Sequence, residues 1–177
     1  MVNRDELLDI YSEDGEVIKR VSRSEAEDAN HITSNVIVFI LNPLNQVLIQ
    51  LRPKTKKHYP GLWDVSTCGG VESGENIEEA ATRELQEETG IAGVDLEYIK
   101  TFMNVFPSED GKEDRKRLSH IYVAITNKSP LIQSDEVDEL RFVPYKELAE
   151  DCKLNPSKYI PPFRTELNIV LDFLKLQ

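Results

Sequence analysis

The chain has 177 residues, 40% of them hydrophobic and 30% charged, which is typical of one globular domain and excludes a disordered chain. Its net charge of −11 argues against a large surface for binding nucleic acid, because a chain with this charge would repel the phosphate backbone overall. No apolar run is long enough to cross a bilayer, and the acidic N-terminus lacks the features of a signal peptide. We therefore expect a single domain spanning residues 1–177, with neither nucleic acid nor membrane as a partner. Two cysteines without metal-site spacing favour a reducing, cytoplasmic location.

Runs of apolar and β-branched residues predict strands in the first part of the chain, at 7–11, 16–21, 35–41, 46–51 and 63–67. The first two flank the turn signal Glu13-Asp14-Gly15, so we expect an N-terminal β-hairpin. The polar segment 22–30 is expected to be a loop or a short helical turn. The strand at 35–41 is almost wholly apolar, which predicts burial on both faces, and the next strand is its partner across a turn. The last of the five strands leads into a glycine-rich loop.

A helix is expected from Ile77 to Thr89, with Asn76 as its N-cap and Gly90 as its stop. At about 100° per residue, three acids of this helix share one arc with its apolar residues. That arc holds Glu84, Glu87 and Glu88 beside Ile77, Ala80 and Ala81, whereas the opposite face carries Glu78, Glu79, Thr82, Gln86 and Thr89. Adjacent carboxylates repel one another and are costly to desolvate unless a cation lies among them. Hard divalent cations such as Mg²⁺ prefer oxygen ligands of this kind, so the helix predicts a metal site.

The second half of the chain predicts two further strands, at 96–105 and 118–126, separated by an exposed charged loop at 107–116. A short strand at 141–143 precedes Pro144, which opens a short helix, and residues 163–174 carry apolar side chains at helical intervals. Strands and helices therefore mix, which indicates an α/β fold with helices packed on a sheet. The N-terminal hairpin and the C-terminal helix offer surfaces for a homodimer.

The glycine-rich loop and the acidic helix together carry one extended motif. Gly69 is followed after five residues by Glu75, and after seven more by the run Arg83-Glu84-Leu85-Gln86-Glu87-Glu88-Thr89-Gly90-Ile91. Over these 23 residues the chain resembles the Nudix hydrolase family at every fixed position. The resemblance implies a Nudix α/β/α sandwich with a mixed sheet, an N-terminal hairpin and a C-terminal helix. It also implies hydrolysis of a diphosphate linkage in a nucleoside diphosphate derivative or a similar small phosphorylated substrate, with Mg²⁺ or Mn²⁺ as cofactor.

The same resemblance assigns roles to individual residues. It implies a metal site held by catalytic carboxylates of the helix and one backbone carbonyl, namely Glu84, Glu87, Glu88 and Gly69. Arg83 and Glu75 would orient these groups through salt bridges and brace the loop. Glu136 lies on a late segment where many Nudix enzymes place a general base, and an exposed loop acid is an equally good interpretation.

Basic residues form two groups outside the motif. The main group lies at 52–58, just before the glycine-rich loop, and we expect Arg52 and Lys56 to bind the diphosphate, since arginine can hold phosphate bidentately. For any one lysine of this group, a solubilising loop is the competing interpretation. Arg115, Lys116 and Arg117 form a second, weaker candidate for binding the diphosphate.

Cys68 supports an alternative function. The run from 31 to 75 also resembles type I isopentenyl-diphosphate isomerase, a member of the same superfamily with a cysteine at this position. His31 matches one of the metal-binding histidines of that enzyme. The chain departs from the isomerase pattern at Gly70, Arg117 and Ser119, and it retains the acid pair of the hydrolase motif. These departures favour hydrolysis, with Cys68 as a small buried residue. A non-catalytic nucleotide sensor on the same scaffold is a third alternative.

Overall fold

The computed structural model describes residues 6–109, 111–132 and 135–175. In this part of the chain seven strands form one sheet with the order β5-β4-β3-β8-β7, in which β6 pairs with β3 and β9 pairs with β4. Their bounds are β3 Thr33–Leu41, β4 Gln46–Leu51, β5 Trp63–Asp64, β6 Thr67–Gly70, β7 Glu97–Pro107, β8 Asp114–Ile125 and β9 Glu139–Pro144. The sheet is mixed, because β3 runs parallel to β8 and antiparallel to β4 and β6.

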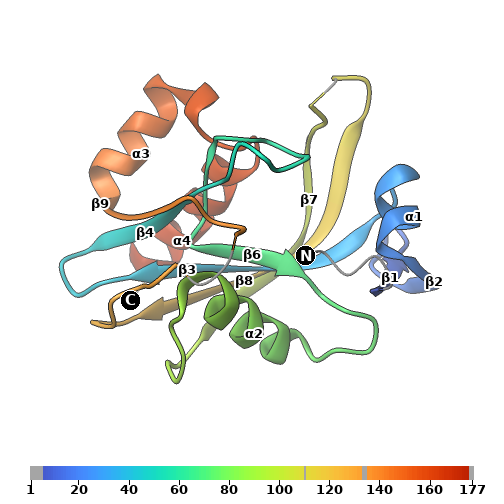
Figure 1. Cartoon of the computed structure of the whole chain (residues 1–177), viewed down its shortest axis with the longest axis horizontal. Coiled ribbons are helices and arrows are strands. Elements are labelled where there is room, and N and C mark those ends of the chain that lie inside the picture. The colour runs from blue at the N-terminus through green and yellow to red at the C-terminus, as the bar shows by residue number, and fades with distance from the viewer. Residues whose placement is uncertain (1–5, 110, 133–134, 176–177) are drawn as a thin grey trace.

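Helices cover both faces of the sheet (Figure 1). One face carries α2 (Ile77–Thr89), and the other carries α3 (Tyr145–Leu154) and α4 (Phe163–Lys175), which are joined by the short 3₁₀ helix η1 (Pro156–Lys158). This arrangement is the α/β/α sandwich that the motif predicts. Among the described helices, none has the length and apolar character needed to cross a membrane.

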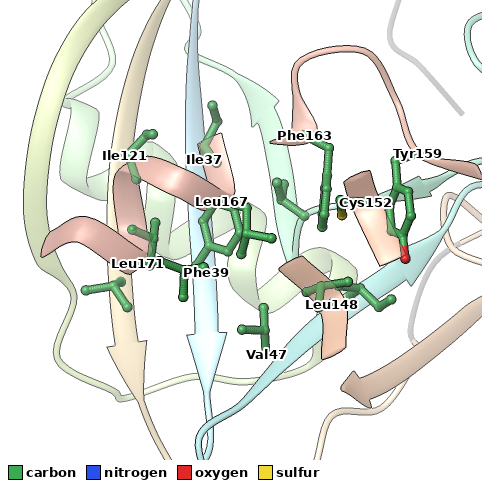
Figure 2. Close-up of a cluster of buried hydrophobic side chains, with 14 of the residues drawn as sticks. Ile37, Phe39, Val47, Ile121, Leu148, Cys152, Tyr159, Phe163, Leu167 and Leu171 are labelled. Carbon is green, nitrogen blue, oxygen red and sulfur yellow. The ribbon is translucent and has the colours of Figure 1, made fainter. Parts of the chain in front are cut away.

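The central strand β3 separates two hydrophobic clusters. All nine of its residues are buried, as its apolar sequence predicts. Because successive side chains of a strand point to opposite faces, Ile37 and Phe39 pack on the α4 side and Val36 and Val38 pack on the α2 side. Figure 2 shows helix α4 laid across the first of these clusters, with its apolar side chains directed at Phe39. The sheet therefore forms a rigid layer between the two clusters.

The N-terminal residues form the expected hairpin beside the main sheet. Strands β1 (Leu7–Tyr11) and β2 (Val17–Ser22) are antiparallel, and the chain continues into α1 (Arg23–Asp28). Residues 23–28 of the segment 22–30 form this helix, and the hydroxyl of Ser22 caps it by accepting a hydrogen bond from the backbone N–H of Glu25 at 3.3 Å. This small unit lies next to the ribbon formed by β7 and β8 (Figure 1).

Two predicted elements differ from the structure. The strand expected at 63–67 is split into β5 and β6, and β6 extends through the two glycines that we expected in a loop. The break occurs at Ser66, whose hydroxyl donates to the carbonyl of Leu48 at 2.6 Å. The loop expected at 107–116 is shorter, because β7 and β8 pair as far as Pro107 and Asp114. The second basic group therefore lies on a strand.

Helix α2 begins and ends where its sequence predicts. The side chain of Asn76 accepts hydrogen bonds from the backbone N–H groups of Glu78 and Glu79 at 2.9 and 3.3 Å, and Gly90 is left-handed with φ of 68°. The expected solvent exposure of Thr89 is wrong. Thr89 is fully buried, because its hydroxyl is satisfied within the helix by donating to the carbonyl of Leu85 at 2.6 Å.

Candidate active site

Glu84 of α2 is buried against the backbone of β6, with 8% of its surface exposed. A Cβ atom built on Gly69 would lie only 1.8 Å from the carboxyl carbon of Glu84. No side chain fits at Gly69, so the glycine is required for space. Burial raises the pKa of Glu84, although the adjacent Arg83 acts in the opposite direction.

Glu88 lies one helical turn beyond Glu84 and is 6% exposed. Its Oε2 atom accepts hydrogen bonds from the side chain of Gln50 at 2.9 Å and from the backbone N–H of Cys68 at 3.2 Å. Burial raises the pKa of Glu88 to about 8, and the negative charge of Glu84 adds to this effect. A carboxyl group in such surroundings favours its neutral form near pH 7, and a cation placed beside it would favour the ionised form.

Glu87 occupies a different environment from the other two acids. Its side chain is 59% exposed and lies 3.4 Å from a guanidinium nitrogen of Arg83. The expectation that all three acids face inward is therefore wrong for Glu87. Within residues 6–109, 111–132 and 135–175, no three His, Cys, Asp or Glu side chains are grouped as a metal site. Glu84 and Glu88 face β6, whereas Glu87 faces Arg83 and solvent.

Arg83 joins the acids to the preceding loop. Its Nε and Nη2 atoms donate to the two carboxylate oxygens of Glu75 at 2.8 and 2.9 Å, and Nη1 donates to Glu84 at 2.7 Å. Nη2 also donates to the carbonyl of Gly70 at 3.1 Å. Although burial raises it, these hydrogen bonds hold the pKa of Glu75 below its ordinary value. Arg83 thus fixes the loop and one buried acid together, and the contact with Glu87 is the longest that it makes.

Arg52, expected to bind the diphosphate, is anchored within the protein. Its Nη1 atom donates to the buried carboxylate of Asp64 at 3.0 Å, and Nε and Nη2 both donate to the carbonyl of His58. Burial raises the pKa of Asp64, and the charge of Arg52 opposes that rise. Arg52 therefore holds the basic loop on β5.

Lys56 and Glu136 are brought together, although 80 positions separate them in the sequence. The Lys56 Nζ atom lies 3.0 Å from Glu136 Oε1. After burial and the influence of its nearer neighbours, the charge of Glu136 contributes to the raised pKa of Glu84. The expected base and the expected phosphate ligand are therefore neighbours of each other and lie within electrostatic reach of the acidic helix.

A family model described as the NUDIX domain matches residues 31–163. The chain belongs to the Nudix hydrolase family. Nudix hydrolase 3 of Arabidopsis thaliana is 29% identical over 167 residues, and the match covers 89% of this chain but only 22% of that relative. An isopentenyl-diphosphate Delta-isomerase of Serratia proteamaculans is 27% identical over 161 residues, covering 91% of this chain and 89% of the relative.

The fold of the Nudix chain is also found in a solved structure. The crystal structure of DR0079 from Deinococcus radiodurans superposes with a TM-score of 0.74 at 21% identity, covering 94% of this chain and 98% of that one. The predicted fold class is therefore confirmed. Nudix hydrolases are pyrophosphohydrolases that bind small phosphorylated substrates and generally use divalent metal ions.

Cys68 of this Nudix chain has intermediate exposure as a whole residue, so it is less buried than expected. Its Sγ atom accepts a hydrogen bond from the side-chain amide of Asn35 at 3.2 Å, and Asn35 in turn accepts one from the hydroxyl of Ser119 at 2.7 Å. Burial of the thiol raises the pKa of Cys68 well above its ordinary value. The thiol is therefore neutral, whereas a nucleophilic cysteine needs a lowered pKa.

Two residues near this Nudix site have no place in the sequence-based interpretation. Glu166 of α4 is 3% exposed and accepts a hydrogen bond from the side chain of Asn104 at 2.8 Å. Burial raises the pKa of Glu166 to about 8. The sequence pattern that could have identified Glu166 is the one that identifies Glu84, namely an acid on the apolar face of a helix. Arg23 of α1 gives no such signal, since its position near Gly70 depends on how α1 folds back on the sheet.

Proposed function

We propose that the chain is a single-domain, metal-dependent hydrolase that cleaves a diphosphate linkage in a nucleoside diphosphate derivative or a similar small diphosphate. One observation carries the proposal: Glu84 and Glu88 are buried a turn apart against β6, and Gly69 leaves room for the carboxylate of Glu84. Burying two carboxylates this close together costs folding free energy, and packing alone gives no reason for a domain to keep them. Membership of a pyrophosphohydrolase family gives them a chemical purpose.

Glu84 and Glu88 fit a divalent cation, and Glu87 would join them only by turning away from Arg83. The metal would be held by hard oxygen donors, namely the carboxylates of Glu84, Glu87 and Glu88 and the carbonyl of Gly69, and such donors suit Mg²⁺ or Mn²⁺. Burial disfavours the ionised form of Glu88, and a bound cation would offset this effect by stabilising the carboxylate. When bound, the ion supplies charge neutralisation at the phosphate oxygens and a lowered pKa for the attacking water.

The remaining roles follow from the contacts of each side chain. Arg83 positions Glu84 and, through Glu75, keeps the loop carbonyls in register with the helix. We assign proton removal from water to Glu136, because it is the acid outside the helix whose charge acts on Glu84. Lys56 would exchange its contact with Glu136 for a substrate phosphate, so that substrate binding changes the surroundings of the proposed base.

Arg52 is still proposed to contact the substrate, although most of its hydrogen bonds go to the protein. Two of its nitrogen atoms donate to a carbonyl and a third donates to Asp64, so its position is fixed before any substrate binds. A guanidinium group carries five N–H donors, and those that are not engaged can reach a phosphate oxygen. We propose that Arg52 is a preorganised contact at the edge of the site.

A substrate screen tests the proposed hydrolysis. Nucleoside di- and triphosphates, sugar nucleotides and dinucleotides are incubated with the full chain and Mg²⁺ or Mn²⁺, and release of phosphate or a monophosphate is measured. We expect turnover of at least one member and its loss in Glu88→Gln, which preserves the shape of the side chain. Asp172→Asn is the matched control, because this α4 acid is 74% exposed and pairs only with Lys175 among the described residues. An equal rate for Glu88→Gln would contradict the metal assignment.

Two alternatives have distinct outcomes in the same screen. The thiol of Cys68, which accepts a hydrogen bond from Asn35, is the observation that keeps isomerisation under test, together with the relative named as an isomerase. An isomerase would interconvert isopentenyl and dimethylallyl diphosphate and lose that activity in Cys68→Ala. A sensor would bind a nucleotide in calorimetry and leave it intact. We expect neither result.

The assembly and location of the chain follow from its surface and its thiols. Val17 and Ile18 of β2 are 55% and 63% exposed, and this hairpin edge suits the pairing of two copies. We propose a homodimer through the hairpin, which light scattering after size-exclusion chromatography would detect, and Ile18→Lys should give a monomer. Cys68 and Cys152 are both free thiols, which suits the reducing cytoplasm.

A further inference from the structure

A cleft with a basic lining lies between α1 and the first residues of β8. Its cavity volume is about 30 Å³, and its charged and polar lining residues are Arg23, Glu27, Asn30, His31, Thr33, Arg115, Lys116 and Arg117. Four of these residues carry a full positive charge and one carries a negative charge. Such a concentration is unusual in a chain whose net charge is −11. The cleft therefore has the opposite sign to most of the protein surface.

Arg115 and Arg117 differ from the other cations of the cleft in having no acceptor within residues 6–109, 111–132 and 135–175. Arg23 donates to both carboxylate oxygens of Glu6 at 2.7 Å, and Lys116 pairs with Glu13. Among the described residues, neither the guanidinium of Arg115 nor that of Arg117 makes a hydrogen bond or an ion pair. Two positions apart on β8, they lie on the same face of the strand. The protein thus places two like charges on one face without a hydrogen-bonded counter-charge in the part of the chain that is described, although Glu27 and Glu109 act on them from a longer range.

The surroundings of Arg117 make this arrangement costly without a bound anion. Burial lowers the pKa of Arg117, and the positive charges of Arg115 and Arg23 add to the effect, whereas Cys68 and Glu27 oppose it. Glu166 is a buried acid whose pKa the charge of Arg117 lowers, but burial outweighs this effect and raises that pKa to about 8. Glu166 is therefore mostly neutral at pH 7 and does not cancel the charge of Arg117.

The cleft adjoins the candidate active site at two points. A Cβ atom built on Gly70 would lie 2.9 Å from the Nη2 atom of Arg23, and Glu84 is one of the acids whose charge acts on Arg23. On the other side, burial raises the pKa of Tyr59, and the positive charges of three arginines, Arg115, Arg117 and Arg52, oppose that rise. The unpaired guanidinium groups are thus close to both the acidic helix and the basic loop.

We propose that Arg115 and Arg117 form an anion pocket that binds a phosphate group of the substrate, with Arg23 as its third wall. The proposal rests on the proposed function, because it assigns the pocket to a substrate of that site. Phosphate is the class of anion that fits best, since it can accept from two guanidinium forks at once and carries more than one negative charge. A single carboxylate would balance only part of the charge gathered here.

Metal-free binding of a simple anion isolates this pocket from catalysis. Inorganic phosphate and inorganic pyrophosphate are titrated calorimetrically into the full chain in EDTA, at low salt and pH 7. We expect Arg117→Gln and Arg115→Gln each to weaken pyrophosphate binding about tenfold or more, which is the effect of losing charged hydrogen bonds. Arg117→Lys keeps the charge but loses the fork, so an intermediate loss is expected. Arg164→Gln on the exposed face of α4 removes the same charge and should bind as the parent does.

The outcomes separate this proposal from the proposed function. Glu88→Gln should lose turnover and still bind pyrophosphate in EDTA. If no compound in the screen is hydrolysed but pyrophosphate binding requires Arg117, the pocket stands and the hydrolase assignment falls. If the parent chain does not bind either anion, or if the Arg115→Gln, Arg117→Gln double variant binds as tightly as the parent, the pocket is wrong. Circular dichroism of each variant, compared with the parent, shows that a lost signal is not lost folding.

Discussion

Gly69 and Gly70 are adjacent on β6, yet Gly69 lies next to a negatively charged side chain and Gly70 next to a positively charged one. A side chain on Gly69 would collide with the carboxylate of Glu84, and one on Gly70 would collide with the guanidinium of Arg23. Because successive residues of a strand point to opposite faces, one short strand separates an acidic region from a basic one. Gly69 is needed to admit the carboxylate of Glu84, and Gly70 leaves room for the end of the Arg23 side chain.

The two regions differ in how the protein satisfies their charges. On the acidic side, Glu84 and Glu88 accept hydrogen bonds from Arg83, Gln50 and the backbone of Cys68. On the basic side, Arg115 and Arg117 have no such partner among the described residues. The acidic region can therefore persist without a ligand, whereas the basic region gains most when an anion binds. This difference suits a site in which a cation and a phosphate are held by separate groups of residues.

Substitution of Gly69 should break the acidic region most severely. In Gly69→Ala the new Cβ must displace Glu84, which has no free space on its buried side. We expect a loss of activity of about 100-fold or more, since displacement of a reacting group by about 1 Å has this effect. Overpacking should also lower the free energy of unfolding by about 1–3 kcal/mol. Initial rates and urea denaturation measure the two effects, and a fully active variant would contradict the proximity of Gly69 and Glu84.

Replacement of Arg83 should disturb the same region less. Arg83→Lys keeps the charge but loses the paired hydrogen bonds to Glu75, so Glu84 and the loop are no longer held together. We expect activity to fall about 10- to 100-fold, which is typical for loss of a residue that orients metal ligands. Metal affinity, measured by titration of Mn²⁺, should fall with it. Arg164→Lys is the matched control, and equal metal affinity in both variants would remove the positioning role.

The contrast between the two regions also explains what the sequence reveals. The acidic region is contained in 23 consecutive residues with a helical period, so its residues and the helix bounds are predictable. The basic region combines residues near positions 23 and 117, which only the parallel pairing of β3 with β8 and the fold of α1 bring together. The exposure of Glu87 and the anchoring of Arg52 depend on side-chain partners, and no local pattern encodes these.

Glu166 lies on the basic side, and its substitution tests why that side remains positive. Its pKa is raised by burial from 4.5 to about 8, so the folded state binds a proton that the unfolded state has lost. The stability that Glu166 contributes is therefore present below pH 4.5 and is lost as the pH rises through about 8. Glu166→Gln has no such titration. We expect its melting temperature, relative to the parent, to rise between pH 5 and pH 9.

The exposed acid Asp172 provides the control for this comparison. Asp172→Asn also removes a carboxylate from α4, but that side chain is 74% exposed and should show no comparable trend. Parallel melting curves for Glu166→Gln and the parent at every pH would show that Glu166 is ionised in the folded protein. In that case its charge would partly cancel that of Arg117, and the basic region would need no anion.

Gly70→Ala should have the smallest effect and is the most informative partner for Gly69→Ala. The new Cβ would meet the end of the Arg23 side chain at 2.9 Å, and a long side chain can move where a buried carboxylate cannot. We expect stability to change by less than about 1 kcal/mol, as for substitutions that disturb only flexible groups. Because Arg23 borders the anion pocket and is no metal ligand, KM should rise while kcat stays close to the parent value. A fall in kcat as large as that of Gly69→Ala would mean that β6 does not separate the two regions. The acidic and basic regions would then act as one site.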